Sequence, residues 1–126
     1  MKREILLLDE NGMSLVPTDT SRIAMTEYEI AALFGVIVPT VRAAIKASYK
    51  SGVIREGNAK RCLHRKNGNV IEVYSVEAVV ALAFRVDSFG ANKVREYLFR
   101  TLRANRRSAV HLLLTCSRNA GTTAPN

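Results

Sequence analysis

Basic side chains recur at helical spacing near the middle of this 126-residue chain. Arg42, Lys46 and Lys50 are each four residues apart, which places them on one side of a helix. Such side chains neutralise phosphates, and an arginine can also donate two hydrogen bonds to the edge of a guanine base. A second basic group follows further along the chain. The positions that we assign to contacts with duplex DNA are Pro39, Thr40, Arg42, Lys46, Lys50, Lys60, Arg61, Arg65 and Lys66.

Charge is distributed unevenly along the chain. Residues 1–41 carry three basic and six acidic side chains, whereas residues 42–126 carry sixteen basic and five acidic ones. The formal net charge of +8 therefore comes from the second part, which alone has +11. A basic excess confined to one part of the sequence is typical of polyanion binding, because each neutralised phosphate releases counterions.

The stretch of residues 25–46 predicts the two helices that must position the first basic group. Thr26 and Glu29 have the spacing of a capping box, which marks the start of a helix. Gly35 provides the positive φ that a tight turn needs, and Pro39 suits the first position of the second helix. This pattern is typical of a helix-turn-helix, whose second helix enters the DNA major groove. The residues expected to face inward from that second helix are Val41, Ala44 and Ile45.

Ile37 and Val38 precede the second helix and leave an alternative open. Small polar residues usually cap a helix at this point. Two apolar residues can instead contact thymine methyl groups, or they can bind a protein partner. The pattern is therefore compatible with two classes of protein, a DNA-binding protein and a protein-interaction module on the same helices.

A β-hairpin is predicted near the N-terminus. Residues 4–8 and 13–16 are rich in apolar side chains and flank the turn sequence Asp9-Glu10-Asn11-Gly12. Residues 17–22 then form a polar linker to the first helix.

A second hairpin is predicted after the two helices. Residues 59–66 and 69–74 flank Asn67-Gly68, the residue pair that a type I′ turn prefers. We interpret this basic hairpin as a wing that lies along phosphates beside the groove. With a type I′ turn, one face carries Cys62, His64, Ile71 and Val73, and the other carries Arg61, Leu63, Arg65 and Glu72.

Residues 74–86 predict an apolar helix with Ser75 as its cap. Beyond the first turn this helix is apolar on all sides until Arg85, so it must be covered on more than one side. A second subunit can cover the stripe that contains Leu82, which predicts a homodimer. The alternative is intramolecular, with a helix over residues 91–104 folding back onto both stripes. The stripes are Val76, Val79, Val80 and Phe84 on one side, and Ala78, Leu82 and Val86 on the other.

The sequence contains no arrangement typical of catalysis, such as paired carboxylates, a nucleophile elbow or a glycine-rich phosphate loop. We therefore expect neither an enzyme nor a cofactor. Cys62-x-His64 and His111-x4-Cys116 contain zinc-ligand types, but their spacing matches no common zinc module, and we expect His64 to be packed or partly buried. With two cysteines and no apolar run that spans a bilayer, the expected location is the cytoplasm.

Residues 25–46, 74–88 and 91–102 resemble the bacterial RhuM family. Phe84-Arg85-Val86-Asp87-Ser88 is similar to the family's Tyr-Arg-Val-Asn-Ser signature. A second family pattern, Ala-x-x-Phe-Arg-x-Trp, matches around Ala91 and Arg95, although Val94 and Tyr97 replace larger aromatic residues, and Ile37 replaces a polar residue after the turn. The resemblance covers about residues 4–104. It implies a DNA-binding-like module, often encoded on mobile elements, and no enzyme.

These features predict an α+β fold, namely a winged helix-turn-helix with an N-terminal β-hairpin and two further C-terminal helices. We divide the chain into residues 1–22 (hairpin and linker), 23–104 (winged helix-turn-helix and two helices) and 105–126 (a basic extension ending in a disordered tail). The expected function is duplex DNA binding by a transcriptional regulator or a mobile-element accessory protein. The alternative is a protein-protein interaction module on the same scaffold.

Overall fold

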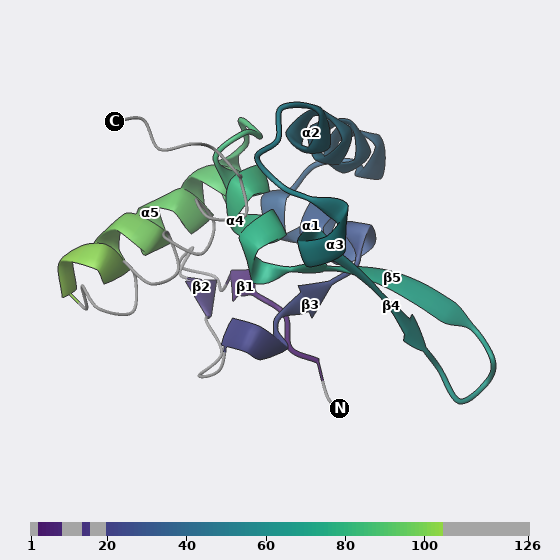
Figure 1. The fold of residues 1–126 in the computed structure, drawn as a ribbon. Helices are drawn as coiled ribbons and strands as arrows, with labels where there is room; N and C mark the ends of the chain where they lie inside the picture. Colours follow the sequence, from purple (N-terminus) through teal and green to yellow (C-terminus); the bar gives the residue numbers. More distant parts are fainter. Residues whose placement is uncertain (1–2, 9–13, 16–19, 105–126) are drawn as a thin grey trace.

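The computed structural model describes residues 3–8, 14–15 and 20–104. Within these residues the chain has an α+β fold with five α-helices and a three-stranded antiparallel sheet (Figure 1). Two further short strands pair near the N-terminus. The predicted α+β class is therefore confirmed for the described residues.

The N-terminal hairpin is present but shorter than expected. Strands β1 (Leu7–Leu8) and β2 (Ser14–Leu15) pair antiparallel, while the predicted turn at residues 9–12 lies outside the described residues. Glu4 forms a parallel bridge with Ile23 instead of extending the hairpin. The Glu4 amide donates to the Arg22 carbonyl at 2.9 Å, which ties the first residues to the short 3-10 helix η1 (Thr20–Arg22). Part of the predicted linker is thus helical.

A third strand, β3 (Ala24–Met25), was not predicted. It pairs with β5 (Val70–Ser75), which also pairs with β4 (Lys60–His64), so the sheet order is β3-β5-β4. Both residues of β3 are apolar and buried, so the strand lacks the alternation that would reveal it in the sequence.

Helices α1 (Glu27–Phe34) and α2 (Val38–Lys50) match the two predicted helices closely. The capping box forms as expected, because the Glu29 amide donates to Thr26 Oγ1 at 3.2 Å and the Thr26 amide donates to Glu29 Oε1 at 2.9 Å. Gly35 has a φ of 71° and ends α1. The two helices meet at a bend of 107°, and Pro39 is the second residue of α2 rather than the first.

Glu29 is also held by a second partner. Arg3 makes two hydrogen bonds to its carboxylate at 2.6 and 2.8 Å. Burial alone would raise the pKa of Glu29, but the bonds from Arg3 and Thr26 outweigh it and lower that pKa below its usual value. This contact therefore stabilises the fold above the pKa of about 4.3 that glutamate has in an unfolded chain, and the stabilisation is lost as pH falls through the lower folded-state pKa.

We expect Glu29→Gln to lower the free energy of unfolding by roughly 1 kcal/mol at pH 7, because a glutamine keeps the cap but not the charge opposite Arg3. The deficit should shrink as pH falls below about 4. Urea unfolding at pH 7, 5 and 3 measures it. Glu96→Gln is the control, since Glu96 is 55% exposed in its pair with Lys93. A deficit that stays constant with pH would contradict the prediction.

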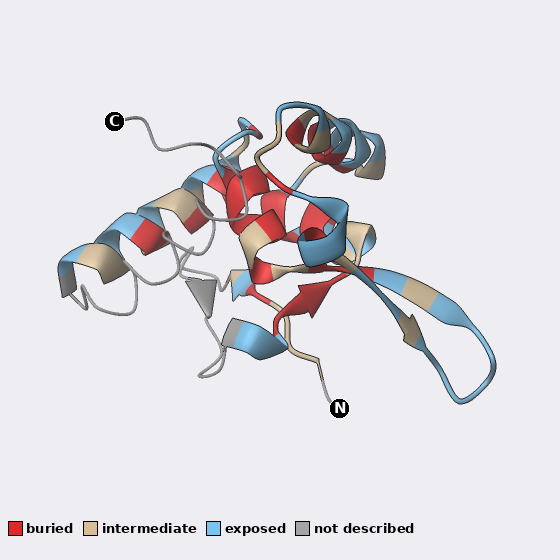
Figure 2. Ribbon diagram, in the orientation of Figure 1, coloured by how far each residue is buried: buried red, intermediate tan, exposed pale blue. Residues whose placement is uncertain are grey.

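The core lies between the helices and the sheet (Figure 2). Helix α4 (Val76–Ala83) sits at its centre, with every residue buried except Glu77. Helices α2 and α5 (Phe89–Ala104) both pack against α4, and α5 also contacts α1. Leu82 is fully buried within the one chain. The Leu82 stripe is therefore covered within the chain and offers no surface to a second subunit, whereas Phe84 of the other stripe is 47% exposed.

The connection from α4 to α5 is held by side chains that also carry the RhuM resemblance. Helix α4 ends three residues earlier than predicted. Arg95 donates to the carbonyl of Ala83, the last residue of the helix, and to that of Val86, three residues further on. Ser88 Oγ accepts from the Ala91 amide at 3.1 Å and donates to the Phe34 carbonyl at 2.8 Å. One hydroxyl thus caps α5 and joins it to the end of α1. Ser75 occupies the N-cap position of α4 as predicted, but its buried hydroxyl makes no capping hydrogen bond in the described structure.

Candidate nucleic-acid interface

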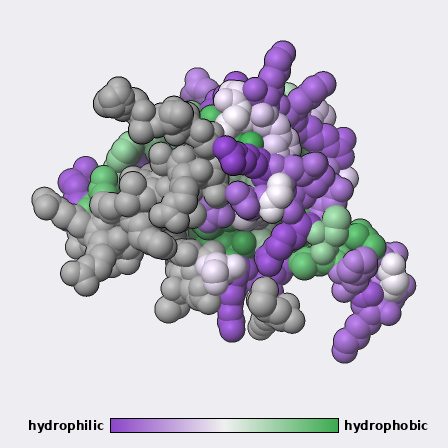
Figure 3. All heavy atoms as spheres, viewed as in Figure 1, coloured by the Kyte–Doolittle hydropathy of each residue, from purple (hydrophilic) through white to green (hydrophobic). Residues whose placement is uncertain are grey.

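The outer side of α2 is exposed and basic. Its inner side is buried through Val41, Ala44 and Ile45, as the sequence predicted, and this burial fixes the rotation of the helix. The side chains of Lys46 and Lys50 make no ion pair or hydrogen bond with the described part of the chain. Hydrophilic side chains project from this region in Figure 3. The exposed predicted site residues of α2 are Pro39, Thr40, Arg42, Lys46 and Lys50.

Arg42 differs from the two lysines because it already has a partner. Its Nε and Nη2 atoms donate to Glu27 Oε1 at 2.9 and 2.6 Å. These hydrogen bonds raise the pKa of Arg42 above its usual value. The Arg42 side chain is still 58% exposed. The pair orients the guanidinium against the start of α1 and partly neutralises it.

The hairpin β4–β5 has a different turn from the predicted one. The Arg65 amide donates to the Asn69 carbonyl at 2.8 Å, and the Gly68 amide donates to the Arg65 carbonyl at 3.0 Å. These bonds close a three-residue loop over residues 66–68. A type I′ turn needs positive φ at both central residues, but Gly68 has a φ of 88° and Asn67 does not have a positive φ. The type I′ prediction is therefore wrong.

The longer loop changes which side chains share a face. Arg61 lies opposite Val73 and Leu63 lies opposite Ile71, whereas Cys62 lies opposite Glu72. The predicted face assignment is wrong by one residue, and in a strand this moves every side chain to the other side. His64 is exposed, so the expectation of a packed or partly buried histidine is also wrong.

Lys60 is the second predicted contact that is already paired. Its ammonium lies 3.4 Å from a carboxylate oxygen of Glu56, on the short helix α3 (Glu56–Ala59), and 3.7 Å from one of Glu72. Burial alone would lower the pKa of Lys60, but these two acids raise it. Arg61, Arg65 and Lys66 are exposed, and their side chains make no ion pair within the described residues.

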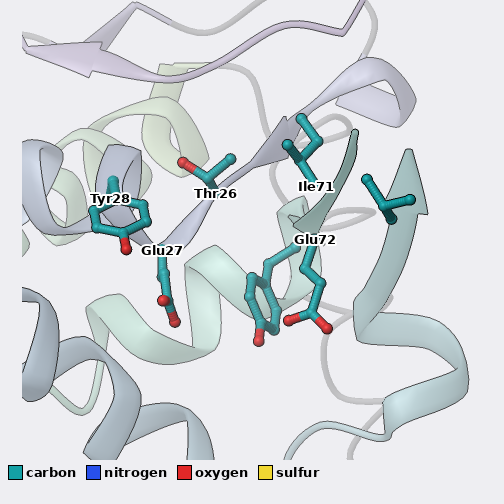
Figure 4. Close-up of a pocket in the computed structure, with 7 residues that line it drawn as sticks. Thr26, Glu27, Tyr28, Ile71 and Glu72 are labelled. Atoms are coloured by element: carbon teal, nitrogen blue, oxygen red, sulfur yellow. The ribbon is translucent and has the colours of Figure 1, made fainter. Parts of the chain in front are cut away.

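Two open pockets flank the hairpin, one on each side. The first, of about 260 Å³, lies between the start of α1 and β5 and contains the carboxylates of Glu27 and Glu72 (Figure 4). The second, of about 300 Å³, is basic and lies beside the N-terminal segment. The first is lined by Thr26, Glu27, Tyr28, Val70, Ile71, Glu72 and Tyr74, and the second by Arg3, Arg61, Leu63, His64, Arg65 and Ile71.

Sequence reasoning missed Arg3 and Glu27 as parts of this surface. Arg3 belongs to a segment that the pattern assigned only to a hairpin and linker, and no contact was predicted for Glu27. Their partners Glu29 and Arg42 lie 26 and 15 residues away in the sequence. Local spacing carries no signal for such contacts.

The zinc-type residues do not form a site in the described structure. No group of three or more possible metal ligands occurs among the described residues, and Cys62 is an exposed free thiol. His111 and Cys116 lie outside the described residues, as does the whole predicted basic extension and tail at residues 105–126.

No single helix of the described chain combines the length and apolar character needed to cross a membrane. The bent pair of α1 and α2 has that length and composition only when the two helices are taken together. Comparison with protein-family models, with curated proteins and with solved structures gave no match. The resemblance to the RhuM family therefore stays a prediction.

Proposed function

We propose that this protein binds duplex DNA, with α1 and α2 as a helix-turn-helix and the hairpin β4–β5 as a wing. The observation that carries the proposal is the exposed basic side of α2, held outward by a fully packed inner side. The bend of 107° and the three-residue turn beginning with Gly35 agree with helix-turn-helix geometry, in which helices meet at about 90–120°. Such a module suits a transcriptional regulator or an accessory protein of a mobile element.

Within this proposal the basic residues have different roles. Lys46 and Lys50 are available for phosphate or base contacts, whereas Arg42 contacts DNA in the orientation that Glu27 imposes. At the tip of the wing, Lys66 lies along the backbone of this duplex, whereas Arg61 and Arg65 lie on the face of the hairpin that borders the pocket beside Arg3. Lys60 contributes little directly, because two carboxylates already surround it.

The test is a titration of random-sequence duplex at several salt concentrations. If about four to six phosphates are neutralised, log K should fall against log[salt] with a slope near −4 to −5. We expect the double variant Lys46→Ala/Lys50→Ala to weaken binding by about tenfold to a hundredfold near 100 mM salt and to flatten the slope by about two. Fluorescence anisotropy of a labelled duplex measures both quantities.

The matched control is Arg100→Ala/Arg103→Ala, which removes two exposed charges from α5. An equal loss of affinity in the control would mean that net charge alone, rather than the surface of α2, drives binding. If wild-type protein leaves the duplex free even at 50 mM salt, DNA binding is rejected.

If DNA binding is rejected, the second candidate function, a protein-protein interaction module on the same helices, applies. Ile37 is 69% exposed at the start of α2, and its side chain does not cap the helix. An apolar side chain in this position favours a protein partner that docks on Ile37 and Val38.

A further inference from the structure

The two arginines of the hairpin lie on the side away from α2. Arg61 and Arg65 share their face with Leu63 and Ile71, because alternate residues of a strand point the same way. This face borders the pocket that includes Arg3, at the N-terminal segment. Figure 1 shows that segment and α2 on opposite sides of the hairpin base.

The side of the hairpin that points toward α1 and α2 carries carboxylates that are already paired with cations. Glu72 lines the pocket that also contains Glu27, and Figure 4 shows Ile71 and Glu72 pointing in opposite directions from the strand. Lys60 on this side is paired with Glu56 and Glu72. Carboxylates therefore separate the basic surface of α2 from the arginines behind the hairpin. Because Arg42 and Lys60 on this side are already paired with carboxylates, a phosphate backbone lying on α2 gains little by extending across it.

The arginine face has the features of a polyanion contact. The side chains of Arg61 and Arg65 are exposed and make no hydrogen bond or ion pair within the described residues. Leu63 and Ile71, both half-buried, lie between them as an apolar floor. The Arg3 guanidinium at the edge of this face is paired with Glu29, so it adds neither a net charge nor a free donor, and the contact rests on Arg61 and Arg65.

The spacing of the two arginines favours a polymer over a small anion. A strand rises by about 3.3 Å per residue, so four residues separate their Cα atoms by about 13 Å. Duplex DNA carries one charge for roughly every 1.7 Å of its axis, and an extended backbone can contact both guanidinium groups. A single phosphate would contact both only if the two side chains extended fully toward each other.

We propose that the face formed by Arg61, Leu63, Arg65 and Ile71 binds the phosphate backbone of a second duplex, so that one molecule joins two DNA segments. The inference rests on the proposed binding of a first duplex by α2. The two basic surfaces, one on α2 and one on the far side of the hairpin, then bind different duplexes. The basic side of α2 holds one duplex, and the arginine face holds another.

The experiment is a capture assay with the full chain at 50 mM salt. One duplex is fixed to beads, protein is bound at less than saturation, and a fluorescent second duplex is added after washing. Wild-type protein should retain the second duplex. We expect Arg61→Ala/Arg65→Ala to reduce this capture at least fivefold, while affinity for a single duplex falls by less than about threefold, because α2 still binds.

Two further variants distinguish this site from general charge and from the α2 site. Arg61→Lys/Arg65→Lys should restore capture in large part, and Arg100→Ala/Arg103→Ala should leave it unchanged. Lys46→Ala/Lys50→Ala should weaken both single-duplex binding and capture. Circular dichroism confirms that each variant is folded.

Capture that persists in Arg61→Ala/Arg65→Ala would overturn the proposal, since bridging would then come from other surfaces or from two copies of α2. Tight binding of one duplex without capture of a second by wild-type protein would overturn it as well, and would leave the proposed function intact. Failure of single-duplex binding would reject both.

Discussion

Gly90→Ala is expected to lower the free energy of unfolding by about 3 kcal/mol or more. A Cβ atom at this position would lie 2.6 Å from the carbonyl carbon and oxygen of Phe34, and it would also collide with the Leu33 carbonyl. Because these are backbone atoms at the end of α1, no side-chain rotation relieves the contact. Helix α5 would have to move away from α1, which would also break the hydrogen bond from Ser88 to Phe34.

Gly57→Ala is the matched control for this substitution. Gly57 lies in the one-turn helix α3, and a Cβ atom there would meet nothing within 4 Å. Alanine should therefore be neutral or stabilise the fold by up to about 1 kcal/mol. Urea unfolding monitored by circular dichroism measures both variants. A Gly90→Ala protein within 1 kcal/mol of wild type would show that α5 does not approach α1 as closely as described.

Leu82→Lys is expected to abolish the folded state rather than to separate subunits. Leu82 is fully buried at the centre of the core, between the helices that cover α4. A lysine there loses the packing of the leucine and places an ammonium group among the apolar side chains of the described core. Each of these losses costs several kcal/mol, which together approach the whole stability of a domain of this size. The variant should show no cooperative thermal transition.

Phe84→Lys is the control, one residue past the end of the same helix. Phe84 is 47% exposed, and its ring makes an edge contact with Phe99 at 5.9 Å between centroids. Its replacement should cost only about 1 kcal/mol and leave a normal transition. A folded Leu82→Lys protein would contradict the packing described for α4. The predicted homodimer is a separate question that sedimentation equilibrium answers, and any interface has to lie outside the Leu82 stripe.

The features that could be predicted from the sequence are those with a local cause. The capping box of Thr26 and Glu29 depends on residues three apart, and Gly35 is the residue type that a left-handed turn requires. The inner side of α2 follows from helical periodicity alone. These signals sufficed for the helix pair, for the existence of both hairpins and for the course of α5.

The features that could not be predicted depend on distant residues or on small energy differences. Asn67-Gly68 is compatible with both a two-residue and a three-residue loop. Strand β5 is also held on its other side by β3, and the sequence of β3 lacks the alternation that would have revealed this strand. The pairing of Arg42 with Glu27 requires the bend between the helices to be known. The candidate site was therefore predicted as one basic surface, whereas the structure divides it between two sides of the hairpin.

The side of the hairpin on which its arginines lie depends on the number of residues in the loop, and not only on which residues the strands contain. Because β5 is anchored by β3, deletion of a single codon in the loop would slide β4 by one position. Arg61 and Arg65 would then exchange sides with Lys60, Cys62 and His64, although no residue of either strand had been substituted. Insertions and deletions at residues 66–68 are thus the mutational route by which this scaffold could move a charged surface from one side to the other in a single step.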